Sequence, residues 1–174
     1  MKLNPLVHNV IWPAVAGSIL WTFLQVAADP NSIGPRTPRL AALLVVGVYL
    51  AIDWVNTDQV NSINEKYWRY DMPIAGLLAT FAVGLQFGSR WAAWPLAAAF
   101  AIAIIGHLFG AWDRNGVSSS RKARVTMAGF NTLGLILLLI GMFVKQPYGL
   151  WLTPIAAFSV VVLFLFFRTR LSTW

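Results

Sequence analysis

The chain has no cysteine and few charged residues. Cysteine is absent from all 174 residues, which excludes disulfides, thiolate metal ligands and a cysteine nucleophile. Only 11% of the residues are charged, against about 25% in soluble domains. Since 58% of the residues are hydrophobic, the few charged residues cannot cover a water-facing surface. We therefore expect the chain to face lipid.

Acidic residues are scarcer than basic ones. Six Asp and Glu stand against 13 Lys and Arg, so the formal net charge is +7. Such an excess is typical of nucleic-acid binding when it covers one face, but here the basic residues fall between apolar runs. In a membrane protein the same excess orients the chain against anionic lipid. The sequence thus predicts membrane lipids as partners and no nucleic acid.

Motifs of known catalytic and cofactor chemistry are also missing. The chain contains no GxSxG, HExxH, Walker or CxxCH motif, and no lysine inside an apolar run that could hold retinal. The two histidines, His8 and His107, are too few for a metal site and a thin basis for haem ligation. We expect no cofactor and no metal, and the sequence does not point to an enzyme.

Long uncharged runs organise the residues that are present. Stretches such as LAALLVVGVYLAI are continuously apolar, whereas the strands of a membrane barrel alternate. About 20 apolar residues suffice for a helix to cross roughly 30 Å of hydrocarbon. The sequence therefore predicts an all-α integral membrane protein, a single domain over residues 1–174 folded as a compact bundle of about six transmembrane helices. The predicted spans are about residues 8–28, 40–57, 72–89, 91–112, 125–144 and 147–167.

Basic residues predict the orientation of these spans. The connections on one side hold nine Lys and Arg, and those on the other side hold four. This bias places both termini in the cytoplasm and indicates a multi-pass protein of a plasma (inner) membrane. The small residues Val26, Ala27 and Ala28 before Asp29 leave one alternative open. Cleavage there as a signal peptide would leave five spans.

Two ionisable residues lie clearly inside predicted spans, where a charge is costly. Asp53 is in the second span and His107 in the fourth, and a rise of about 1.5 Å per residue puts them about 20 Å and 24 Å from the outer ends of their helices. If these helices pack together, the carboxylate and the imidazole could carry or sense a proton. Each residue also has a structural interpretation: Asp53 at headgroup level or paired with Lys66 or Arg69, and His107 as a neutral histidine bonded to a carbonyl.

Further polar residues gather toward the predicted cytoplasmic side. Tyr49, Asp53 and Asn56 share a helical stripe, because Asp53 and Asn56 follow Tyr49 by four and seven residues. Asn131 lies about two turns into the fifth span, and His8 opens the first. Together with His107 these residues are candidates for binding or proton coupling, and their placement predicts a cavity that opens toward the cytoplasm.

A ridge of small residues runs along the fourth predicted span and includes the GxxxG motif GHLFG. Small residues let helix backbones approach closely in a membrane, where packing replaces the missing hydrophobic drive. The ridge predicts helix packing inside one chain, with a homodimer seam as the alternative. Its members are Ala99, Ala103, Gly106 and Gly110.

Three hypotheses of function remain open on the sequence. The first is a channel or transporter for a small solute or ion, proton-coupled through Asp53 and His107. The second is a non-catalytic membrane subunit or effector that acts by oligomerisation or by docking to a membrane protein partner. The third is an intramembrane enzyme on a lipid substrate, for which the paired carboxylates of a catalytic motif are lacking.

Overall fold

The structure is a computed structural model built of helices. No strand occurs in the residues that it describes, so the prediction of an all-helical bundle is confirmed. The described residues are 7–29, 36–60, 68–87, 90–112, 119–145 and 148–171, without the side chains of 7–8, 53–60, 68, 90, 119–120 and 167–171. The elements are η1 (Val7–Ile11), α2 (Trp12–Ala28), α3 (Arg36–Val60), α4 (Trp68–Gln86), η2 (Arg90–Ala92), α5 (Ala93–Trp112), α6 (Ser119–Phe143) and α7 (Tyr148–Leu171).

Local sequence explains where α2 begins and ends. Pro13 lies in the first turn of α2, directly after the π-helical turn η1, and it has no backbone N–H to donate to a carbonyl of that turn. Asp29 directly follows the helix in an extended conformation, with φ −78° and ψ 109°. The next residue is Pro30, whose ring disfavours helical geometry in the residue before it. The helix thus ends where the apolar run ends.

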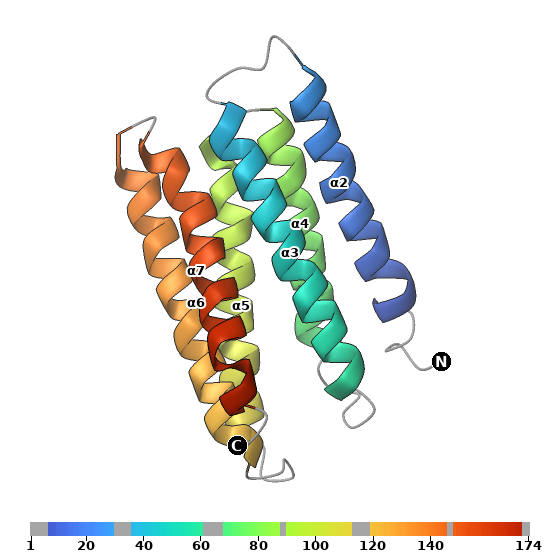
Figure 1. The fold of residues 1–174 in the computed structure, drawn as a ribbon, viewed down its shortest axis with the longest axis vertical. Helices are drawn as coiled ribbons and strands as arrows, with labels where there is room; N and C mark the ends of the chain where they lie inside the picture. The colour runs from blue at the N-terminus through green and yellow to red at the C-terminus, as the bar shows by residue number, and fades with distance from the viewer. Residues whose placement is uncertain are drawn as a thin grey trace.

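The six long helices form a closed ring. In contact order the ring runs α2, α3, α7, α6, α5, α4 and back to α2. Figure 1 shows them side by side along the long axis of the molecule, with the start of α2 and the end of α7 at the same end. Consecutive helices therefore run in opposite directions. Most neighbours in the ring are also neighbours in the chain, except at the α3–α7 and α2–α4 contacts.

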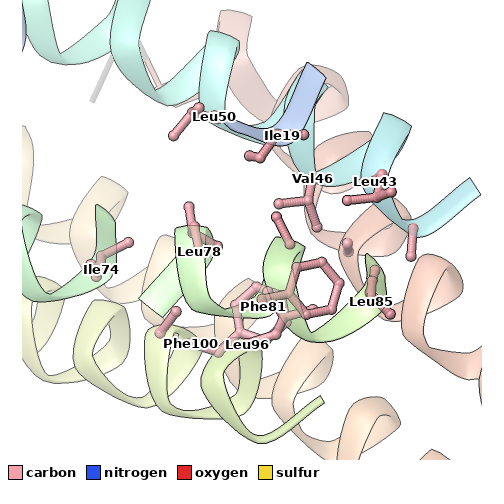
Figure 2. Close-up of a cluster of buried hydrophobic side chains, with 14 of the residues drawn as sticks. Ile19, Leu43, Val46, Leu50, Ile74, Leu78, Phe81, Leu85, Leu96 and Phe100 are labelled. Carbon is pink, nitrogen blue, oxygen red and sulfur yellow. The ribbon is translucent and has the colours of Figure 1, made fainter. Parts of the chain in front are cut away.

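Apolar side chains fill the interior of this ring. The largest fully buried ones include Phe81 of α4 and Phe100 of α5. In Figure 2 they lie in one cluster with residues from α2 and α3, such as Ile19 and Val46. Leu138 of α6 and Val160 of α7 belong to the same core, so all six helices contribute to it.

Helices α6 and α7 approach each other most closely at glycines of α6. A Cβ atom added to Gly134 would lie 2.7 Å from Cγ2 of Val160 and 3.3 Å from Cε2 of Phe100. A Cβ added to Gly141 would lie 2.8 Å from Cβ of Leu152. Both distances to α7 are shorter than a van der Waals contact, so glycine is needed at these positions for the helices to pack as they do.

Four helical segments are long and apolar enough to cross a membrane, judged by length and composition within the described residues. They lie in η1–α2, α5, α6 and α7, and their bounds are Asn9–Ala28, Ala93–Trp112, Arg121–Phe143 and Tyr148–Phe166. Helices α3 and α4 are not among them: the described side chains of α3 end at residue 52, which leaves too short a stretch to span, and α4 carries the charged residues Arg69 and Asp71 in its first turn. The chain is thus a membrane-type helical bundle with four candidate spans.

Substituting alanine for Gly134 should destabilise the bundle, whereas the same change at Gly129 should not. Val160 is fully buried and must shift to admit the new methyl, so overpacking should cost about 1–3 kcal/mol, more than the gain in helix propensity of at most about 1 kcal/mol. Gly129 lies on the same helix with nothing within 4 Å of an added Cβ. Tryptophan fluorescence during SDS-induced unfolding measures both variants, and equal stabilities would contradict the close α6–α7 contact.

Candidate functional site

The structure leaves the predicted Asp53–His107 pair untested. Asp53 and Asn56 belong to α3, but their side chains are in the segment 53–60 that is outside the described side chains. The side chain of His8 in η1 is outside them as well. The predicted proton-coupling pair and the predicted cytoplasmic cavity therefore stay predictions.

Tyr49 and His107 both have described surroundings. The half-buried ring of Tyr49 meets Phe100 of α5 edge to face, with ring centroids 6.3 Å apart. His107 is partly exposed on α5, and Arg124 of α6 is a charged neighbour of its imidazole. Tyr49 thus connects α3 to the apolar middle of the bundle, while His107 lies two helical turns further along α5.

Asn131 is a polar residue in the middle of the packed region. Its side chain is fully buried on α6, and its Nδ2 donates a hydrogen bond to the Met127 carbonyl, 2.9 Å away. Oδ1 of the same amide is buried without a hydrogen-bond partner among the described residues. The described hydrogen bond of this amide is thus within its own helix, while its carbonyl oxygen is left without a donor among the described residues.

The predicted small-residue ridge of α5 lies inside the protein. Ala99, Ala103, Gly106 and Gly110 are all buried. A Cβ added to Gly106 would lie 3.1 Å from Cγ of Tyr70, at the start of α4. Tyr70 in turn stacks on Phe109, with ring centroids 6.4 Å apart. At Gly106 this face of α5 therefore packs against α4 of the same chain.

The strongest polar cluster among the described residues lies at the end of the bundle opposite the start of α2 and the end of α7. There the first turn of α3 carries two arginines between the C-terminal ends of α2 and α4. Nε of Arg36 donates to the Val26 carbonyl at 2.9 Å, and Nη1 of Arg39 donates to the Leu85 carbonyl at 3.1 Å. The last carbonyls of a helix lack partners within it and carry partial negative charge, so arginine stabilises both helix ends.

Arg39 is the most unusual member of this cluster. Its side chain is only 3% exposed, and both Nε and Nη2 are buried without a hydrogen-bond partner among the described residues. Burial lowers the pKa of the Arg39 guanidinium, the Asp29 carboxylate raises it, and Arg36 lowers it further. Arginine stays protonated at any ordinary pH, so the charge itself remains. A buried donor without an acceptor costs about 1–3 kcal/mol, and more when charged.

A pair of glutamines completes the polar layer. Nε2 of Gln86, the last residue of α4, donates to Oε1 of Gln25 on α2 at 3.1 Å. The layer therefore joins α2, α3 and α4 through side chains at one end of the bundle. It offers basic and amide groups that can hold an anion, and its described members include no nucleophile and no carboxylate pair.

In the sequence, Arg36 and Arg39 contribute only to the charge bias that predicts the orientation of the chain, and they are not predicted as a site. Arg39 stands directly before an apolar run, the usual place of an arginine that anchors a span at the interface. Its acceptor, the Leu85 carbonyl, is 46 residues away and is a backbone group. The only available signal was two arginines three residues apart at the start of a span, which by itself predicts no burial.

Comparison with protein-family models, curated proteins and solved structures finds no match to this chain. Within the described residues no group of three or more His, Asp or Glu side chains could hold a metal ion. The site must therefore be interpreted from its own chemistry.

The Gln25–Gln86 hydrogen bond should contribute measurable coupling between α2 and α4. In a double-mutant cycle with Gln25→Leu and Gln86→Leu, we expect a coupling free energy of about 0.6 kcal/mol, the average for such bonds between membrane helices. SDS-induced unfolding of the four proteins measures it. Thr80→Val provides the control, because the Thr80 hydroxyl bonds only to Gly76 of its own helix. A coupling free energy between Gln86→Leu and Thr80→Val as large as that between Gln86→Leu and Gln25→Leu would contradict a specific hydrogen bond between the glutamines.

Proposed function

We propose that the chain is a six-span membrane protein that acts as a non-catalytic membrane subunit or effector, by binding its partners. The observation that carries this proposal is the filled interior of the ring. Phe81, Phe100, Leu50 and Leu138, from four different helices, are each at most 2% exposed. A route for a solute or an ion needs polar groups or water along it, and a packed apolar constriction excludes both.

The buried polar side chains are too few to line a passage. Among the described residues they are Thr22, Arg39, Asn131 and Thr153, each on a different helix. Arg39 is at one end of the bundle and donates to a helix terminus, and Asn131 is bonded within its own helix. This distribution supports a protein that presents groups at its ends and flanks rather than one that conducts along its axis.

The proposal includes α3 and α4 as the fifth and sixth spans. With 25 and 19 residues they are about 37 Å and 28 Å long, close to or above the roughly 30 Å of hydrocarbon. In the ring α3 lies between α2 and α7, and α4 lies between α2 and α5. Since these neighbours are candidate spans, α3 and α4 occupy the same layer of the membrane.

Orientation and partners follow from the distribution of charge. The excess of Lys and Arg on one set of connections supports cytoplasmic termini in a plasma (inner) membrane. Exposed aromatic side chains such as Trp91, Trp94 and Trp151 near the other end suit the interface with headgroups. Lipids are the partners that these features support, with a second copy or another membrane protein as a further partner.

Cysteine labelling should place α4 across the membrane, with α6 as the reference span. The chain has no cysteine, so each single substitution provides a unique thiol. In right-side-out vesicles, an impermeant maleimide should label Phe87→Cys and Lys145→Cys directly, and Arg69→Cys and Lys122→Cys only after permeabilisation. All four positions are exposed, two at each end of the bundle. Labelling of Arg69→Cys on the same side as Phe87→Cys would remove α4 from the spans.

Reconstituted protein should not conduct protons or small ions. We expect proteoliposomes carrying a pH-sensitive dye to leak at the rate of protein-free vesicles, because the ring interior is filled. An ionophore added at the end of each trace shows that the vesicles are sealed, and Asp53→Asn is the matched variant. Flux above the protein-free rate that Asp53→Asn abolishes would replace this proposal with the proton-coupled pathway.

A further inference from the structure

One edge of the Arg39 guanidinium is buried and has no acceptor among the described residues. Nη1 is used by the Leu85 carbonyl, and the two remaining nitrogens, Nε and Nη2, are the buried ones without partners among the described residues. These two nitrogens share one side of the planar group, and their N–H bonds point the same way. This is an edge with which arginine binds two oxygens of a carboxylate or phosphate at once.

The surroundings of this edge favour an anion. Arg36 and Arg39 carry two positive charges, and Asp29 is the carboxylate that acts on Arg39. The three side chains therefore sum to one positive charge; the positive N-terminal end of α3 adds to it, and the negative C-terminal ends of α2 and α4 offset part of it. A neutral acceptor would satisfy the N–H groups but would not compensate this charge. An oxyanion would satisfy the N–H groups and also compensate the charge.

The position of the edge identifies the class of anion. Arg39 lies at an end of the bundle, directly before the apolar stretch of α3, which is the level of lipid headgroups when that stretch crosses the membrane. The cluster reaches the surface through half-buried Arg36 and exposed Asp29. Phosphate is the anion concentrated at that level, and arginine binds it with two parallel hydrogen bonds.

We propose that Nε and Nη2 of Arg39 form a bidentate binding site for a phosphate oxyanion at this end of the bundle. Arg36 supplies a second positive charge beside it. A phospholipid headgroup and free inorganic phosphate share this chemistry, so the test has an arm for each source.

Native mass spectrometry in a neutral detergent tests the site with the full chain. Phosphatidylglycerol, phosphatidylcholine and inorganic phosphate are titrated separately, and retained adducts are counted per protein. We expect one tight adduct in the wild type and about tenfold weaker retention in Arg39→Lys, which keeps the charge but loses the two-nitrogen edge. Lys145→Gln, an exposed basic residue at the same end, is the matched control and should bind like the wild type.

The pattern across the arms identifies the source of phosphate. Retention of phosphatidylglycerol, with or without phosphatidylcholine, indicates a headgroup, and retention of inorganic phosphate alone indicates a free anion. Equal retention by wild type and Arg39→Lys would show general electrostatic attraction and overturn the proposal, as would no specific adduct in any arm.

A second measurement on the wild type covers the case in which Arg39→Lys does not fold. A ligand that binds only the folded state raises the unfolding midpoint as its concentration rises. We expect this for phosphatidylglycerol or phosphate and not for sodium chloride at the same ionic strength. No midpoint shift in any arm would reject the site. Ion flux in proteoliposomes is independent of either result, so failure here and failure of the proposed function are distinguishable.

Discussion

The shape of the bundle depends on the contacts that the aromatic side chain of Phe100 makes. This side chain lies on α5, is 2% exposed, and meets Tyr49 of α3 edge to face at 6.3 Å. On its other side it comes within 3.3 Å of where a Cβ of Gly134 on α6 would be. One side chain therefore reaches two helices that are not neighbours in the ring. Dispersion contacts of this kind replace the hydrophobic drive that helices lack in lipid, and they explain why the interior is closed.

Much of the fold could be predicted because an apolar run long enough to cross a membrane must satisfy its backbone as a helix. The limits of the helices were harder to predict than their existence. Helix α3 begins at Arg36, four residues before the predicted span, and α4 begins at Trp68 instead of residue 72. A helix continues through charged residues beyond the hydrocarbon, so hydropathy describes the span and not the helix. The order of helices around the ring has no signal in a single sequence.

The candidate site was less predictable, for a physical reason. Sequence reasoning looks for ionisable residues inside apolar runs, which selected Asp53 and His107, and those two remain predictions. Arg39 stands at the edge of a run and becomes unusual only when the α4 terminus is placed against it. Backbone carbonyls leave no mark in a sequence, so neither its burial nor its unpaired edge could be inferred. Conversely, the small residues around Gly106 were identifiable because close packing requires small side chains.

The contact between α3 and α7 has a consequence for how the protein is made. These helices are adjacent in the ring but are separated in the chain by α4, α5 and α6. A ribosome delivers helices to the membrane in chain order, so the ring stays open along one flank until α7 has been inserted. Until then the faces of α3 and α6 that pack against α7 lack this partner. Ring closure is thus a late step of biogenesis, and it coincides with the arrival of the last described helix.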